Sequence, residues 1–243
     1  MNTRETLKVN EKGHLEIGGA DCVELAREFG TPLYVFDEAY IRRMMRVYRD
    51  TLEKEYAGNG LVLYASKAFS CEAVYRIARQ ERIGVDVVSG GELYTALKAG
   101  FPASKIYMHG NNKLDYELEE ALDAGVGCIV ADAYAEIDKI DREAKKRGRT
   151  QNILLRINPG VEAHTHAYIQ TAKTDSKFGF SIADGTAEKI TAYALTKNTS
   201  RFAASIAISV RRSSKGSRLC SRRKNVWILP RKSSKSSDSS RKN

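Results

Sequence analysis

The chain has 243 residues, 42% of them hydrophobic, and a formal net charge of +10 at pH 7. This length and hydrophobic content suffice for a buried core. No stretch approaches 18 consecutive apolar residues and the polar N-terminus lacks the layout of a secretory signal, so we expect a soluble cytoplasmic protein with no membrane partner. The four cysteines are widely scattered, which argues against a CxxC metal site or a disulfide framework.

The positive charge is concentrated at the end of the chain. Residues 201–243 carry 13 Lys or Arg against one acid, Asp238, whereas residues 1–200 carry 27 basic and 29 acidic residues. The tail, 205–243, consists mainly of Ser, Lys and Arg, so we expect it to be disordered. A nucleic-acid-binding protein acting through this tail is an alternative function. A basic run is usually solvated chain, however, and Trp227 is the tail's one aromatic residue, so we expect no nucleic-acid partner.

Short apolar, β-rich runs alternate with helical patterns between residues 61 and 157. The predicted strands are Leu61–Tyr64, Gly84–Val88, Lys105–Met108, Gly127–Val130 and Ile153–Ile157. The predicted helices are Cys71–Arg79, Glu92–Ala99, Tyr116–Ala124 and Ala133–Lys146. Strands that alternate with helices predict parallel pairing through right-handed crossovers.

Parallel strands of this kind form either an open doubly wound sheet or a (β/α)8 barrel. No GxGxxG or GxxxxGK[ST] loop follows any predicted strand, which weakens the case for a nucleotide-binding open sheet. Polar residues instead occur at the strand ends, among them Lys67, Asp86, His109, Asp132 and Arg156. In a barrel these ends converge on one mouth, where catalytic groups are placed. We therefore predict an α/β fold of the (β/α)8 type.

Lys67 follows the first predicted strand directly, in the segment YASKA. A lysine at the mouth of a barrel would be partly desolvated, which lowers its pKa and suits it to Schiff-base chemistry with a carbonyl compound. Judged by position alone, a snorkelling or ion-paired lysine is the commoner case.

Four segments extend the pattern around Lys67: YASKA, DVVSGGEL, HGNNK and LLRINPGVEAHTHAYIQTAKTDSKFGF. Over residues 32 to about 192 the chain resembles the bacterial diaminopimelate decarboxylases, which use pyridoxal 5′-phosphate on an alanine-racemase-like barrel. VEAHTHAYIQT and DSKFG are typical of this branch rather than of ornithine or arginine decarboxylases. The resemblance implies that Lys67 forms the Schiff base with the cofactor. It also implies a homodimer that converts an amino-acid substrate, meso-diaminopimelate, to L-lysine.

The resemblance implies further site residues. It places Asp86 and Arg156 in the cofactor pocket, where their charges would balance those near the Schiff base; a structural ion pair between strand ends is the alternative. His109 either faces the pocket or is a hydrogen-bonded scaffold residue. His164 and His166 have the HxH spacing of metal ligands, but no third ligand lies at a suitable spacing, so we expect no metal.

The chain departs from the family that it resembles after the sixth helix. That family continues with a HCHIGSQ-like motif, a Gly-rich phosphate loop, an EPGR-like segment and a C-terminal β domain, and none of these follows here. Five βα repeats with at most one further strand cannot close a barrel of eight. We therefore divide the chain into an N-terminal segment, 1–31, an incomplete pyridoxal-phosphate barrel, 32–204, and the tail. We expect the 243-residue chain to lack decarboxylase activity.

The start of the tail has an unusual property. Codons can be chosen for SIAISVRRSSK, residues 205–215, such that reading from the third base of the first codon gives HCHIGSQIFE. We hypothesise that the reading frame shifts between about Leu195 and Ser205, which would make the tail a translation artefact. A non-enzymatic pyridoxal-phosphate-binding barrel is a further alternative function, although it would need strands six to eight intact.

Overall fold

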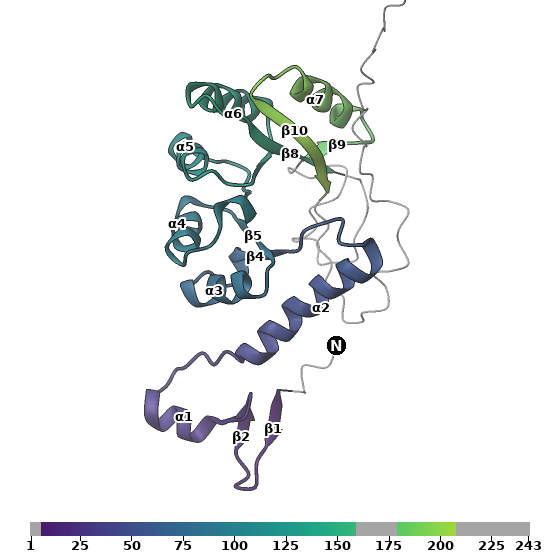
Figure 1. Ribbon diagram of the computed structural model, residues 1–243. Coiled ribbons are helices and arrows are strands. Elements are labelled where there is room, and N and C mark those ends of the chain that lie inside the picture. Colours follow the sequence, from purple (N-terminus) through teal and green to yellow (C-terminus); the bar gives the residue numbers. More distant parts are fainter. Residues whose placement is uncertain (1–5, 159–178, 208–243) are drawn as a thin grey trace, which may run out of the picture. The chain divides into compact units, whose positions relative to one another are not determined.

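The computed structural model describes residues 6–158 and 179–207 (Figure 1). These residues divide into two compact units, 6–128 and 129–207. His164, His166 and the tail beyond residue 207 lie outside the described residues. The segment boundary at 31/32 stays a prediction, whereas strand β10 (Ser200–Ala207) crosses the boundary at 204/205, so residues 205–207 are not the disordered chain expected of the tail. No helix in the described ranges is long and apolar enough to cross a membrane.

The first unit contains a parallel sheet with the order β4-β5-β6. Its strands are β4 (Leu63–Ala65), β5 (Gly84–Val87) and β6 (Ile106–Met108). The helices are α3 (Glu72–Gln80), α4 (Gly90–Lys98) and α5 (Asp115–Ala124), with two 3-10 turns, η2 (Ser66–Ala68) and η3 (Ala103–Lys105). Helices α3 and α4 lie on the same side of β4 and β5 (Figure 1). The largest side chains that are fully buried here are Tyr75, Leu93, Ile106, Met108, Leu118 and Leu122.

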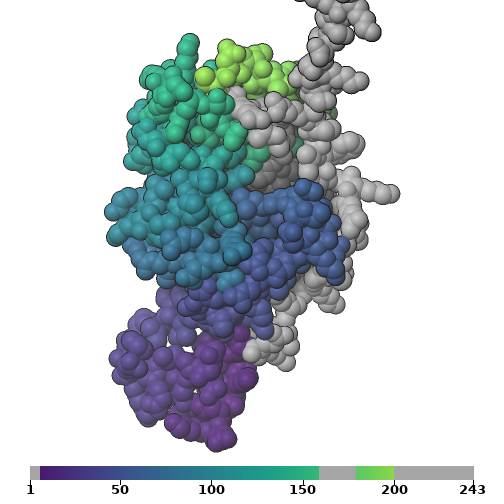
Figure 2. All heavy atoms as spheres, in the orientation of Figure 1, coloured from purple at the N-terminus to yellow at the C-terminus, as the bar shows by residue number. Residues whose placement is uncertain are grey.

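The unit begins with elements that the sequence patterns did not predict. They are β1 (Leu7–Val9), β2 (Leu15–Ile17) and β3 (Ala20–Asp21), which form an antiparallel sheet, and α1 (Cys22–Phe29). Asp21 caps α1 by accepting from the backbone N–H of Val23 at 2.8 Å, and its carboxylate also lies 2.9 Å from His14 Nδ1. None of the side chains of α1 is buried, and the segment lies on the surface in Figure 2. Asp21 therefore ties this helix to the preceding turn.

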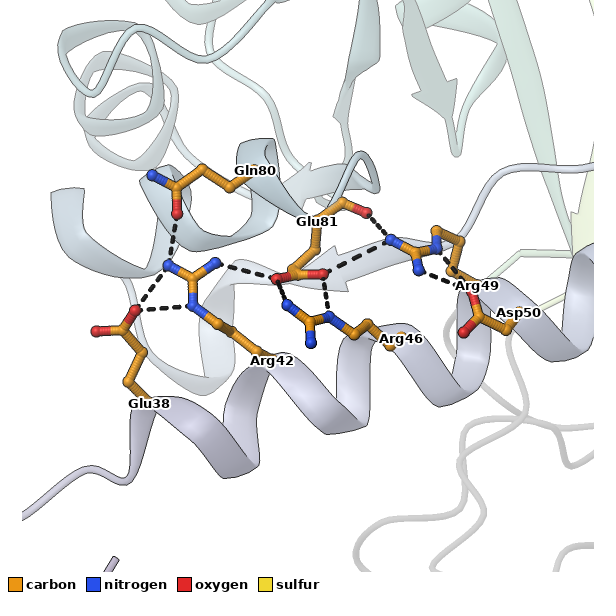
Figure 3. Close-up of polar contacts among 7 residues, drawn as sticks. All are labelled: Glu38, Arg42, Arg46, Arg49, Asp50, Gln80 and Glu81. Carbon is orange, nitrogen blue, oxygen red and sulfur yellow. Dashed lines mark hydrogen bonds and ion pairs between the residues drawn. The ribbon is translucent and has the colours of Figure 1, made fainter.

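One buried carboxylate fastens helix α2 (Glu38–Tyr56) to the end of α3. Arg46 Nε and Nη2 donate to the Glu81 carboxylate at 2.7 and 2.8 Å, and Arg42 Nη1 donates at 3.0 Å (Figure 3). Arg49 Nη1 donates to the Glu81 carbonyl oxygen at 3.0 Å. The hydrogen bonds from Arg46, opposed by burial and assisted by Arg42, lower the pKa of Glu81 to about 2. The α2 contact therefore depends on a carboxylate that stays ionised.

The second unit continues the parallel pattern. Its strands are β7 (Cys128–Ala131), β8 (Gln151–Asn158), β9 (Phe180–Ser181) and β10 (Ser200–Ala207), and its helices are α6 (Tyr134–Lys146) and α7 (Thr186–Leu195). Strand β8 pairs in parallel with β7, β9 and β10. The five predicted strands and four predicted helices are confirmed within two residues at each end, and β10 supplies the sixth strand. The predicted α/β class with parallel strands is confirmed.

Three glutamates close the turns that follow the strands. The backbone N–H groups of Val88, Leu114 and Asp132 donate to the carboxylates of Glu92, Glu117 and Glu136 at 2.7, 2.9 and 2.8 Å, respectively. We call these three acids the strand-end glutamates. Each lies in the first turn of its helix, where the macrodipole favours a negative charge. Glu117 also accepts from the buried N–H of Gly90 at 2.7 Å and so links α5 to α4.

Candidate active site

Lys67 lies on the turn that carries the chain out of the sheet. Strand β4 ends at Ala65, and the next three residues form the 3-10 turn η2, with Lys67 at its centre. The side chain of Lys67 is exposed, so the prediction of a partly desolvated lysine is wrong. The reason is the turn, which places Lys67 beyond the paired part of the strand.

Two tyrosine hydroxyls hold the segment around Lys67. Tyr64 Oη donates to the carbonyl oxygen of Phe69 at 2.8 Å, and the hydroxyls of Tyr75 and Ser70 are hydrogen-bonded at 2.9 Å. Burial raises the pKa of both tyrosines, so their hydroxyls stay protonated at neutral pH. The turn is therefore attached to β4 on one side and to α3 on the other.

Asp86 and His109 form a pair on the neighbouring strand ends. Asp86 on β5 is in register with Ala65 on β4, and His109 follows the last residue of β6. His109 Nδ1 lies 3.5 Å from Asp86 Oδ2. Asp86 Oδ1 and His109 Nε2 are buried and have no hydrogen-bond partner among the residues that the structure describes. Buried polar atoms without partners are rare, and they mark a place where a ligand can bind.

Arg156 belongs to the second unit, where its partner is Asp132. Arg156 Nη1 donates to Asp132 Oδ2 at 3.1 Å, and the two side chains are 11% and 8% exposed. Within its own unit Arg156 is thus ion-paired with the acid that follows β7, and both its predicted place in a cofactor pocket and the alternative pairing with Asp86 stay predictions. Asp132 was not predicted as a site residue, although its place directly after a strand was a signal for it.

In the first unit, the carboxyl edge of the sheet thus carries a primary amine, a carboxylate and an imidazole. A lysine amine can add to the carbonyl group of a cofactor, and a paired carboxylate and imidazole can hold or transfer protons. The structure brings Lys67, Asp86 and His109 to three successive strand ends, β4, β5 and β6. Such an edge suits chemistry in which an amino group exchanges with a bound carbonyl compound.

Comparison with known families assigns the chain to a family. Residues 38–200 match the family described as pyridoxal-dependent decarboxylase, pyridoxal binding domain. The chain belongs to this family. Pyridoxal 5′-phosphate is the cofactor of the pyridoxal-dependent decarboxylases, which confirms the predicted cofactor class.

Relatives within the family are diaminopimelate decarboxylases. The chain is 55% identical to the enzyme of Bacillus methanolicus over 193 residues, which are 79% of this chain and 44% of that protein. It is 50% identical to the enzyme of Bacillus subtilis, over 76% of this chain and 42% of that protein. The chain therefore spans less than half the length of these relatives.

Solved structures give the same assignment of the fold. The crystal structure of diaminopimelate decarboxylase from M. jannaschii in co-complex with L-lysine has a TM-score of 0.75 and 34% sequence identity, covering 85% of this chain and 48% of that chain. The enzyme from Helicobacter pylori, also complexed with L-lysine, has a TM-score of 0.70 and 28% identity, covering 76% of this chain and 46% of that chain. The predicted barrel-type α/β fold is thus confirmed.

The residues of the first unit fit a pyridoxal cofactor. Lys67 offers an exposed amine next to the sheet edge. Asp86 Oδ1 and His109 Nε2 are buried polar atoms that need partners, and a ring with polar substituents can supply them. These groups of the first unit are therefore compatible with a bound pyridoxal cofactor.

Proposed function

We propose that the chain is the cofactor-binding part of a diaminopimelate decarboxylase, a carboxy-lyase that converts meso-diaminopimelate to L-lysine and carbon dioxide. The observation that carries the proposal is the position of Lys67 at the end of β4, with Asp86 on the adjacent strand β5 and His109 directly after β6. Among the described residues, Asp86 Oδ1 and His109 Nε2 are buried without a hydrogen-bond partner. The identity of 55% to a diaminopimelate decarboxylase supports the choice of substrate.

Each residue has a distinct role in this proposal. Lys67 would hold pyridoxal phosphate through its amine, the group of this chain that can condense with a carbonyl compound with loss of water. Asp86 and His109 contact the cofactor through their unpartnered atoms, and Arg156, oriented by Asp132, contributes positive charge. When bound, pyridoxal phosphate supplies the ring that accepts the electron pair released by the departing carboxylate.

Reductive trapping tests the proposal directly. The purified chain is mixed with pyridoxal phosphate, reduced with borohydride and digested, and the modified peptides are quantified by mass spectrometry. We expect the adduct on Lys67, and we expect it to vanish in Lys67→Arg. Lys54→Arg is the matched control, since Lys54 is an exposed lysine of α2 remote in sequence from the site. Uniform labelling of exposed lysines, with no preference for Lys67, would contradict the proposal.

We also propose that the 243-residue chain does not catalyse decarboxylation by itself. The exposure of Lys67 supports this, because an amine in water lacks the desolvated surroundings that the chemistry requires. As parts of the same proposal, the protein acts as a homodimer in the cytoplasm, and the barrel formed by these 243 residues is incomplete. Formation of lysine from meso-diaminopimelate by the purified chain would overturn it.

The frame shift between about Leu195 and Ser205 is a further part of the proposal. The family match ends at residue 200, inside this interval, which supports a change in the coding of the chain there. The experiment is a nucleotide read across codons 190 to 220. A one-base change that restores HCHIGSQ is the expected result, and a confirmed frame without such a change would refute it.

A further inference from the structure

We propose that Tyr64 and Tyr75 are positioning residues that fix the backbone of the Lys67 turn. Because the backbone is already fixed, little conformational entropy is lost when the Lys67 amine binds the cofactor. The inference rests on the proposed function, because it assigns to the turn the task of presenting Lys67. It concerns residues that touch the turn and not the cofactor.

Tyr64 closes the turn upon itself. Its hydroxyl donates to the Phe69 carbonyl at 2.8 Å, and this bond spans the segment that contains Lys67. Tyr64 is itself held in the sheet, where it is in register with Val85 of β5. The sheet therefore fixes one end of the turn through a side chain rather than through backbone pairing.

Tyr75 attaches the same end of the turn, at residue 70, to the core. Its side chain is 0% exposed, and its ring packs edge-on against Phe101 with the centroids 6.5 Å apart. The Tyr75 hydroxyl is hydrogen-bonded to Ser70 Oγ at 2.9 Å. A buried hydroxyl that loses its partner costs more free energy than an exposed one, so this bond favours one conformation of residue 70.

A third contact supports the same segment from outside the sheet. The ring of Phe69 stacks on Phe36 with the centroids 4.4 Å apart and the planes 12° from parallel. Phe36 directly precedes Asp37, whose side chain accepts from the N–H of Tyr40 and caps α2. The turn is thus attached to three elements, of which Tyr64 and Tyr75 supply the polar attachments.

These attachments matter because the side chain of Lys67 is exposed. An exposed lysine has four rotatable side-chain bonds, and ordering them on binding costs free energy. If the backbone moved as well, a smaller fraction of molecules would hold the amine where it can bond. Fixing the backbone during folding leaves only the side chain to be ordered by the cofactor.

The test measures how much cofactor is needed to label Lys67. The wild-type chain, Tyr64→Phe, Tyr75→Phe and the double variant are titrated with pyridoxal phosphate, reduced with borohydride and analysed for the Lys67 adduct. We expect the half-saturating concentration to rise about threefold to tenfold for each lost hydroxyl, the range that corresponds to one hydrogen bond. The yield at saturation should return to the wild-type level. Tyr94→Phe is the control, since Tyr94 is 66% exposed on α4.

Amide hydrogen exchange gives a second measurement that does not depend on the cofactor. Exchange in residues 66–70 should become faster in Tyr64→Phe and Tyr75→Phe, whereas exchange in α4 should not change. If Tyr75→Phe fails to fold, Ser70→Ala removes the same hydrogen bond from the exposed partner and replaces it in the series.

The outcomes separate this inference from the proposed function. A wild-type chain without any adduct on Lys67 overturns the proposed function, and the inference with it. A wild-type chain that labels at Lys67, with variants that label at the same concentrations as Tyr94→Phe, overturns the inference alone. A higher half-saturating concentration without faster exchange in 66–70 also refutes it, because the turn would then be unchanged.

Discussion

Replacing Glu81 with glutamine would remove the negative charge that holds α2 against the end of α3, while keeping the volume of the side chain. The Glu81 side chain is 5% exposed, whereas the side chains of Arg42, Arg46 and Arg49 are 22%, 54% and 36% exposed. Removing one partner of a buried ion pair costs roughly 3–5 kcal/mol. Because Arg46 and Arg49 can turn into water and only Arg42 stays largely buried, we expect about 3 kcal/mol, the lower end of this range.

Urea unfolding followed by far-UV circular dichroism measures this change. A loss of about 3 kcal/mol lowers the midpoint by roughly 1–2 M urea at the slopes usual for domains of this size. Glu38→Gln is the matched control, since Glu38 also contacts Arg42 but is 62% exposed, and its loss should cost less than about 1 kcal/mol. Equal midpoints for Glu81→Gln and Glu38→Gln would refute the reasoning.

Three further changes test other parts of the fold. Glu117→Ala leaves a buried backbone N–H at the start of α4 without its acceptor, and we expect unfolding in urea to show a loss of about 2 kcal/mol. Gly127→Ala would place a Cβ in steric overlap with the carbonyl oxygen of Ser104, so the soluble yield should fall sharply; a wild-type yield would contradict the packing. Glu143 has a pKa lowered to about 2, chiefly by a hydrogen bond from Lys146. Its stabilisation is present above its ordinary pKa of 4.5 and is lost as the pH falls toward 2, so Glu143→Gln should flatten the pH dependence of the urea midpoint in that interval.

The alternation of strands and helices could be predicted because the hydrophobic period of each strand or helix can be read from consecutive residues. The strands of the N-terminal sheet could not, since β1, β2 and β3 are too short for an alternating pattern to be recognised. Helix α2 also gave no clear apolar stripe. It buries only Met45, because its contact with α3 is made by arginines and one carboxylate.

The positions of the site residues were easier to predict than their surroundings. Lys67, Asp86 and His109 follow successive strands, so the parallel order brings them to one edge. The pairing of Asp86 with His109 and of Arg156 with Asp132 depends on side-chain rotamers, which spacing does not determine. The exposure of Lys67 depends on what covers the turn, and no local pattern around the lysine encodes that.

The strand-end glutamates bear on the order in which this chain acquires its structure during synthesis. Glu92, Glu117 and Glu136 each accept from an N–H only three or four residues earlier, so each turn can close soon after it leaves the ribosome. The bond from Gly90 to Glu117 then joins α4 to the helix that follows it. Growth from the N-terminus, one βα repeat at a time, is therefore compatible with these contacts, since the longest of them, which spans 27 residues, needs only the next repeat.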